Sequence, residues 1–393
     1  MNNDKLNLAL ERFVRRFEEF NIEVLEEFGK TISKFEGLSV SEAHKLAQQL
    51  KNGRDIEKIL ADLERISELS RKDIEDLLEI TAKENIDFAN TYYEAKKMDK
   101  VSYEDSKQFQ NLVKAVEKTT KGEFTNLSKT TALKLLKDNG KPLYLDIKKA
   151  YNEVIDRCVL AVATGQMDYQ KAMYDTIKQL SSSGVKKVYY DNKGKQAYAR
   201  RLDSSVRMNI LDGVRQVNIG IQEQVGKEFG ADGVEVSHHV NCAPDHIYID
   251  GQQFSKKKFE KINNNLTRPV ASMNCRHFVF SIVLGVSSPL YTKKQLEQDR
   301  KNNEKGFEYE GKHYTLYEGE QLQRKIELAV RQQKDLQIIA KASNDKDTIS
   351  KTQNNITQLT QKYKELSKIS GLPTKMDRMR VVGYQRVNVN KLK

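Results

Sequence analysis

The residue types best suited to chemistry gather in one short segment, residues 233–254, which reads GVEVSHHVNCAPDHIYIDGQQF. It contains three of the six histidines and one of the three cysteines: His238, His239, His246 and Cys242. Further along the chain, Cys275 and His277 are separated by a single residue. Imidazole and thiolate groups are preferred zinc ligands, so a tetrahedral set could be drawn from His239, Cys242, His246, Cys275 and His277.

The spacing of these residues matches no standard zinc finger, and a second interpretation stays open. His239 and His246 are too far apart for adjacent turns of one helix, and they suit a strand followed by a loop. The segment VEVSHHV predicts that strand, on which His238 would face away from His239. In the alternative, the histidines and Arg276 form a polar network that hydrogen-bonds loop carbonyls and binds no metal.

Two catalytic interpretations also use these residues. Cys275 could be a nucleophile activated by His277, because alternate residues of a strand share one face and Arg276 would point away. A metal-dependent nuclease could instead use His238 and His239 with the Asp245–His246 pair. The sequence has no phosphate-binding glycine loop followed by Lys-Ser/Thr, no Gly-x-Ser-x-Gly and no His-Glu-x-x-His, which favours a role other than catalysis.

Composition places these residues in a helical, basic protein of 393 residues. A charged fraction of 31% and a mean hydropathy of −0.70 favour long helices with much solvated surface around modest cores. The net charge of +12 suits polyanionic surroundings such as nucleic acid. Three cysteines form no disulfide framework. There is no apolar signal-peptide core and no run near the roughly 20 apolar residues of a membrane span, so we expect synthesis in the cytoplasm and no membrane span.

The first proline is Pro142, which predicts that residues 1–141 form helix after helix. Ser70 and Asp73 resemble a capping box and predict a short break between two helices there. A later helix is expected to end at Thr164–Gly165, with Cys158 as a buried structural thiol on its apolar side. The next helix is expected to be capped near Asp168.

The second half of the chain predicts mixed structure. A β-hairpin is expected to turn at residues 191–194, followed by a long helix from about Asp203. Four arginines around this helix could contact nucleic acid or an acidic partner: Arg200, Arg201, Arg207 and Arg215. FVFSIVLG predicts a strand or the start of a helix. FEYEGKHYTLY predicts a hairpin that turns at Glu310–Gly311. The following segment predicts two helices, with an interruption near residues 343–345 and an end at Gly371 and Pro373.

These elements predict an α+β fold with a mainly α-helical N-terminal half, a small α+β module with short strands and a C-terminal helical hairpin. The basic tail could add a short strand at Val381–Val382. The predicted regions are 1–184, helical; 185–230, hairpin and arginine-bearing long helix; 231–317, α+β module with the histidines and cysteines; 318–371, C-terminal helices; and 372–393, basic tail.

Three segments, in this order, resemble the phage minor capsid protein 2 family, which is related in role to Mu-type minor head proteins. They read VEVSHHVNCAPDHIYIDGQQFS, MNCRHFVFSIVLGVSSPLY and YEGEQLQRKIELAVRQQK, and the upstream ARRLDSSVRMNILDGVRQVN is also similar. The likeness covers roughly residues 185–385. Carried over residue by residue, it implies potential metal ligands at His239, His246, Cys275 and His277, with motif positions at Asp245, Gly251, Asn274 and Arg276.

The chain departs from the family pattern at two places within the first segment. Ile249–Asp250 stands where the family commonly has a tryptophan-glutamine pair, and Asn241–Cys242–Ala243 stands where a glycine-alanine-arginine run is usual. Cys242 is therefore left out of the set of four ligands, for which one Zn2+ would be the cofactor.

The resemblance implies a structural minor capsid (minor head) protein of a tailed bacteriophage or prophage. We expect multiple copies per virion inside the capsid near the portal vertex, with the portal protein, other capsid proteins and nonspecifically bound packaged DNA as partners. Its role would lie in head assembly, DNA packaging or ejection. The alternatives are a head-carried metal-dependent nuclease or cysteine hydrolase delivered with phage DNA, and a plain nucleic-acid-binding protein with salt-dependent affinity.

Overall fold

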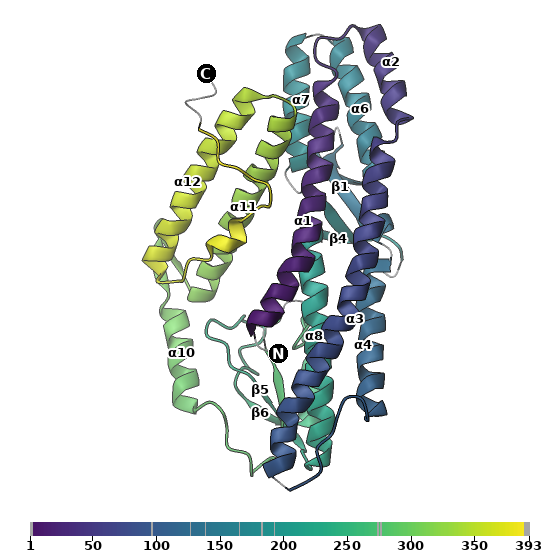
Figure 1. Ribbon diagram of the computed structural model, residues 1–393. Helices are drawn as coiled ribbons and strands as arrows, with labels where there is room; N and C mark the ends of the chain where they lie inside the picture. Colours follow the sequence, from purple (N-terminus) through teal and green to yellow (C-terminus); the bar gives the residue numbers. More distant parts are fainter. Residues whose placement is uncertain are drawn as a thin grey trace. The chain divides into compact units, whose positions relative to one another are not determined.

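The computed structural model describes residues 3–95, 97–125, 127–137, 139–164, 166–181, 184–191, 193–272, 275 and 277–388. Long helices dominate this part of the chain, and its strands form small antiparallel sheets (Figure 1). The predicted α+β class is therefore confirmed. Among the described residues, no helix is both long enough and apolar enough to cross a membrane.

The chain divides into two compact units, each built from segments that are distant in the sequence. The first unit comprises residues 1–11, 69–125 and 207–321, and the second comprises residues 12–68, 126–206 and 322–393. The chain passes from one unit to the other within four long helices and between α4 and α5. Those helices are α1 (Asn3–Ser33), α3 (Asp55–Ala95), α8 (Leu202–Glu228) and α11 (Leu316–Ala342). The five regions predicted from the sequence stay a prediction.

The second unit is built around a four-stranded antiparallel sheet of strand order β2-β1-β3-β4. Apolar residues of α1 at helical spacing form part of its core, and Tyr151 of α6 packs edge-on against Phe28 with ring centroids 5.5 Å apart. Cys158 is fully buried, as expected, and contacts Met173. The further elements of this unit are α2 (Val40–Lys51), α5 (Leu127–Thr130), β1 (Thr131–Leu136), β2 (Pro142–Asp146), α6 (Ile147–Thr164), α7 (Gln166–Ser181), β3 (Lys186–Tyr190), β4 (Gln196–Arg201), α12 (Lys346–Ser370) and a 3₁₀ turn, η1 (Met376–Met379).

A buried network of charged side chains also stabilises the second unit. Arg201 pairs with Asp335 and lies 3.4 Å from Asp203, while Arg331 pairs with Asp203 and with Glu18. Asp335 is fully buried and Arg201 is 6% exposed. Buried charges are tolerated when opposite charges neutralise them, and this network joins α1, β4, α8 and α11 within the unit.

The first unit contains the α+β module that carries the histidines and cysteines. Helix α8 supports the three-stranded sheet of order β6-β5-β7 through Gly226, where an added Cβ would lie 2.4 Å from the side chain of Ser281. The glycine allows the strand to approach the helix closely, and Ser281 donates a hydrogen bond to the carbonyl of Gln222. The further elements are α4 (Lys107–Thr125), β5 (Gly233–Val236), β6 (Gln253–Ser255), α9 (Lys256–Asn265), β7 (Val279–Ile282), α10 (Lys293–Lys305), β8 (Phe307–Tyr309) and β9 (Lys312–Tyr314).

Several predicted elements are confirmed. The hairpin β3–β4 and the hairpin β8–β9 form where expected, and Glu310 and Gly311 both have the positive φ that a tight hairpin turn requires. FVFSIVLG contains strand β7. Helices α11 and α12 are separated at residues 343–345 and lie side by side in Figure 1, and Gly371 ends α12 in the left-handed conformation.

Two predictions for the N-terminal half are wrong. The region expected to be all helical contains β1 and β2, which pair through a turn at Asn139–Gly140. The absence of proline permits a helix without requiring one, whereas an Asn-Gly pair favours a hairpin turn. The break expected at Ser70 does not occur either, because α3 is continuous and Ser70 is fully buried within it. The capping sequence at Ser70 does not end α3, because no glycine or proline interrupts the helical residues around it.

Three boundary predictions also need correction. Helix α7 begins at Gln166, before the expected cap near Asp168, and Gly165 lies outside the described residues. The strand VEVSHHV ends at Val236, so His238 and His239 lie in the following loop. Over residues 371–388, the expected strand at Val381–Val382 is absent and the only regular element is η1. Asn192, in the first predicted turn, also lies outside the described residues.

Candidate metal centre

The pairing of β5 with β7 brings the two chemistry-bearing segments together. Val236, the last residue of β5, is opposite Val279, the first residue of β7. The pairing extends one step further, because Ser237 donates its backbone N–H to the carbonyl of Phe278, and the Phe278 N–H donates to the Ser237 hydroxyl. The loop that follows β5 therefore runs beside the residues that precede β7.

A helical turn within this loop positions two of its polar residues. The backbone N–H of Asp250 donates to the carbonyl of His246, so their side chains project on one face, one turn apart. Gly251 follows with φ +68°, a conformation that favours glycine and that redirects the chain into β6. Ile249, Val270, Ala271 and Cys275 form a buried apolar cluster beneath the turn.

Three potential ligand atoms meet at the centre of the site. The Nδ1 atoms of His246 and His277 lie 3.3 Å apart, and the Sγ atom of Cys275 lies 3.5 Å and 3.4 Å from them respectively. The three residues are between 1% and 4% exposed. Two imidazole nitrogens and one sulfur thus converge in a space from which solvent is largely excluded.

The far nitrogen of each of these histidines faces a hydrogen-bond acceptor. His277 Nε2 lies 3.0 Å from Asp250 Oδ1, and His246 Nε2 lies 2.6 Å from the carbonyl oxygen of Arg268. Both Nε2 atoms therefore donate. Asp250 also accepts from the backbone N–H of His239 at 2.8 Å and contacts His238 Nδ1 at 2.6 Å, while His238 Nε2 contacts Asp299 at 2.9 Å.

A second group of potential ligands shares His277 but uses its other nitrogen. Cys242 Sγ lies 3.6 Å from His277 Nε2, and Asp250 completes the group. The resemblance left Cys242 out of the ligand set, yet the structure places its sulfur against the same histidine.

The electrostatics of the site favour a charged sulfur. Burial alone would raise the pKa of Cys275, but hydrogen bonds from His246 and His277 outweigh it and lower the pKa to about 5. Burial would lower the pKa of His277, but its hydrogen bonds to Asp250 and the two cysteines raise the pKa to about 11. Burial raises the pKa of Asp250, yet the hydrogen bonds from His277 and His238 outweigh it and lower the pKa overall. These shifts favour a thiolate at Cys275 and a protonated ring at His277.

The structure places the remaining predicted residues at different distances from this centre. The His239 ring lies edge-on to the His277 ring, with centroids 4.8 Å apart, and belongs to neither group of converging ligand atoms. Asp245 pairs with Arg268, whose carbonyl accepts from His246. Asn274 and Arg276 lie outside the described residues.

Sequence reasoning missed the two carboxylates that orient the histidines, Asp250 and Asp299. Asp250 was considered only as a departure from the family pattern. Its position four residues after His246 was the available signal, because that spacing places both side chains on one face of a helical turn. Asp299 comes from α10 and offers no such local signal.

The four arginines predicted to contact nucleic acid or a partner differ in exposure. Arg201 is buried in the charge network of the second unit, and Arg215 is 9% exposed and pairs with Asp212 at 3.1 Å. Arg207 is exposed, and Arg200 is half-buried with its guanidinium over the Tyr198 ring.

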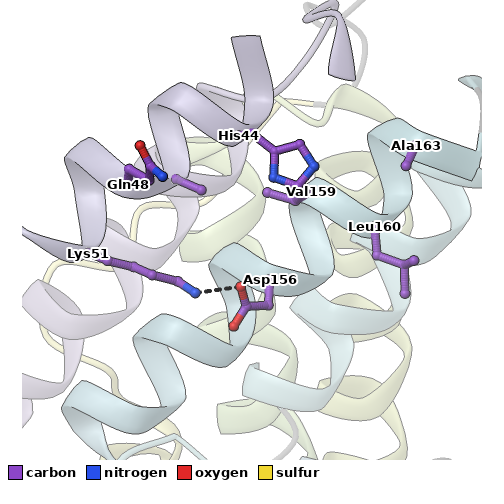
Figure 2. Close-up of a pocket in the computed structure, with 8 residues that line it drawn as sticks. His44, Gln48, Lys51, Asp156, Val159, Leu160 and Ala163 are labelled. Atoms are coloured by element: carbon purple, nitrogen blue, oxygen red, sulfur yellow. Dashed lines mark hydrogen bonds and ion pairs between the residues drawn. The ribbon is translucent and has the colours of Figure 1, made fainter. Parts of the chain in front are cut away.

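A shallow surface pocket between α2 and α6 offers little chemistry. Figure 2 shows Lys51 of α2 joined to Asp156 of α6 across it, at 2.5 Å, with His44 nearby. Its other lining residues are Gln48, Ala47, Val159, Leu160 and Ala163. This lining provides an exposed ion pair and one histidine but no cysteine or serine nucleophile. We therefore interpret the pocket as part of the contact between the two helices.

Comparison with known protein families gives a match over most of the chain. The model of the family described as phage minor capsid protein 2 matches residues 1–367 of this chain. No curated protein and no solved structure matches it.

Proposed function

The chain belongs to the phage minor capsid protein 2 family, and from this premise we propose that it acts inside the phage head, beside the portal vertex. Family membership supports a structural role in the virion and association with other virion components. The portal location, several copies per virion, and action in head assembly, DNA packaging or ejection are the proposed refinements.

The observation that carries the proposal is the net charge of +12 on a chain built from long helices. A positive field attracts packaged DNA without sequence preference, and long helices with polar outer faces provide surface for contacts with other capsid proteins. The charged residues of the second unit's buried network are neutralised internally. DNA contact is therefore assigned to cations outside that network, including Arg207, which is exposed, and Arg200, which is half-buried.

The location is tested by imaging virions that carry this chain. Asymmetric reconstruction of the head is expected to show density for its helices at the portal vertex. Mass spectrometry of purified virions is expected to find several copies per particle. Absence of the chain from the particle, or its even distribution over the shell, would refute the portal location.

The DNA contact is tested by titrating duplex DNA at increasing salt concentration. Binding is expected to weaken as salt rises, since each phosphate contact releases counterions. R200A/R207A is expected to reduce the slope of log affinity against log salt by about two relative to the wild type. K51A, which removes a lysine paired with Asp156, is the matched control. Salt-independent binding, or equal slopes for all three proteins, would exclude this contact.

A cysteine hydrolase is the second candidate, because Cys275, His277 and Asp250 form a thiol–imidazole–carboxylate chain. Their burial disfavours it, since Cys275 is only 2% exposed and a substrate must reach the sulfur. An iodoacetamide assay on the native chain discriminates between the two. Slow alkylation of Cys275 that becomes fast only on unfolding agrees with the structural role, and rapid alkylation of the native chain would favour catalysis.

A further inference from the structure

We propose that His246 Nδ1, His277 Nδ1 and Cys275 Sγ bind one zinc ion, which ties the loop after β5 to the segment before β7. The site provides one thiolate and two imidazoles. This inference concerns the module itself and does not depend on where the chain lies in the virion.

The spacing of the three atoms is the first argument. Zinc bonds of about 2.0–2.1 Å to nitrogen and about 2.3 Å to sulfur, at tetrahedral angles, place two nitrogens about 3.3–3.4 Å apart and nitrogen and sulfur about 3.5–3.6 Å apart. The observed separations are 3.3 Å for the two nitrogens and 3.4 Å and 3.5 Å for nitrogen and sulfur. The three separations therefore match the edges of a zinc tetrahedron to within about 0.2 Å.

The hydrogen bonds of the two rings are the second argument. Because Asp250 and the Arg268 carbonyl accept from the Nε2 atoms, each neutral ring carries its proton on Nε2 and presents a lone pair on Nδ1. Two such lone pairs at 3.3 Å, beside a sulfur, repel one another unless a cation separates them, either the Nδ1 proton of a charged His277 ring or a bound metal ion. Metal-binding histidines typically donate their other N–H to a carboxylate or a backbone carbonyl, as both rings do here.

The competing group of Cys242, Asp250 and His277 fits a metal less well. It would use His277 Nε2, which already faces Asp250. Asp250 in turn accepts from the His239 backbone N–H and contacts His238, so its two oxygens are engaged in orienting other groups. The metal is therefore assigned to the Nδ1 side of His277, with Asp250 as a positioning residue.

A zinc ion at this position would replace missing backbone connections. The ladder between β5 and β7 ends near Val236 and Val279. Beyond it, the loop after β5 contains Asn241 and the segment before β7 contains Ala271, both at positive φ. A metal bound by ligands from both segments closes the loop and contributes folding free energy that a module with such short strands otherwise lacks.

The first experiment measures zinc in the purified full-length chain. About one zinc per chain is expected in the wild type, and its loss is expected in C275S and in H246A. C242S and H313A are the matched controls, because Cys242 lies on the other side of His277 and His313 is an exposed histidine on β9. Retention of zinc in C275S, or its loss in C242S alone, would overturn the assignment.

A second measurement does not require a variant to fold. X-ray absorption at the zinc edge of the wild-type chain is expected to show one sulfur and at least two imidazole nitrogens around the metal. After exchange with Co2+, a thiolate-to-metal charge-transfer band is expected. A wild-type chain that takes up no zinc on refolding with Zn2+, or a zinc shell without sulfur or with two sulfurs, would refute the site.

Discussion

Asp250 Oδ1 lies 3.0 Å from His277 Nε2 and at the same time accepts the backbone N–H of His239 at 2.8 Å. One buried carboxylate thus hydrogen-bonds both the ring of His277, which faces Cys275, and the backbone of the loop after β5. The orientation of His277 therefore depends on a residue one helical turn beyond His246.

Replacing Asp250 by asparagine is expected to weaken zinc binding without removing a ligand. The neutral amide accepts through its oxygen alone and presents an NH2 group where Asp250 Oδ2 contacts His238 Nδ1, so His238 loses an acceptor and the acceptor for His277 loses its charge. Loss of a hydrogen-bonded carboxylate behind a metal-binding histidine lowers metal affinity about 10- to 100-fold. Competition with a chromophoric chelator measures the affinity, and circular dichroism checks the fold.

The matched control for D250N is D299N, since Asp299 contacts the far nitrogen of His238, which is not a proposed ligand. A smaller loss of affinity is expected there. If D250N binds zinc as tightly as the wild type, Asp250 does not orient His277 toward the metal.

Substitution of Gly251 by alanine is expected to destabilise the first unit. Its φ of +68° costs a residue with a Cβ about 1–2 kcal/mol. The new Cβ would also lie 2.6 Å from the end of the Leu296 side chain, which must move. G230A has a similar φ of +71° with open space around the Cβ, so it measures the backbone cost alone. Thermal unfolding is expected to rank the midpoints as wild type, G230A and then G251A, and equal midpoints for the two variants would show that the Leu296 contact costs nothing.

The sequence predicted the elements whose signals are local. Helices α11 and α12, the hairpin β8–β9 and the glycine that ends α12 follow from periodicity and turn residues within a few positions of one another. The wrong helical prediction at β1 and β2 also concerns a local signal, which in this case was overlooked. The pattern up to Pro142 was interpreted through a missing helix breaker, and the local turn signal of Asn139–Gly140 was not used.

The site was only partly predictable, because its geometry depends on pairing between distant strands. Residue types and spacing named His246, Cys275 and His277, and the structure brings their side-chain atoms within 3.5 Å of one another. The place of Asp299 depends on how α10 packs, and that of Cys242 on the path of a loop. Neither is encoded by a period or a turn, so the sequence could not distinguish which groups surround each nitrogen of His277.

Removal of the Arg201 side-chain charge is expected to destabilise the second unit strongly. R201M would leave Asp335, which is fully buried, without its cation, and breaking a buried pair in this way costs about 3–5 kcal/mol. R200M removes the neighbouring half-buried arginine and is expected to cost under about 1 kcal/mol. Pulse labelling of Cys158 in increasing urea, read by mass spectrometry, reports unfolding of this unit because that thiol is fully buried. Equal urea midpoints for the two variants would show that Arg201 and its network contribute no more to stability than the half-buried Arg200.

The pH dependence of the second unit is expected to change when Glu18 is replaced by glutamine. Burial and the neighbouring Asp203 raise the pKa of Glu18 to about 7, against the lowering effect of Arg331, Arg201 and Arg380. The folded state thus binds this proton more tightly than the unfolded state, for which the pKa is 4.5. The contribution of Glu18 to stability is therefore present below pH 4.5 and is lost as the pH rises through about 7.

Glutamine at position 18 does not ionise, so E18Q is expected to gain stability relative to the wild type as the pH rises from 5 to 8. The pKa difference sets an upper limit of about 3 kcal/mol on this relative gain. Cys158 labelling in urea at each pH measures it, and E19Q is the control because Glu19 is exposed and pairs with Arg15. For E19Q, the difference in stability from the wild type is expected to stay constant from pH 5 to 8. If the difference for E18Q is constant as well, Glu18 is already ionised in the folded chain at pH 5. In that case Arg331 outweighs the effect of burial on its pKa.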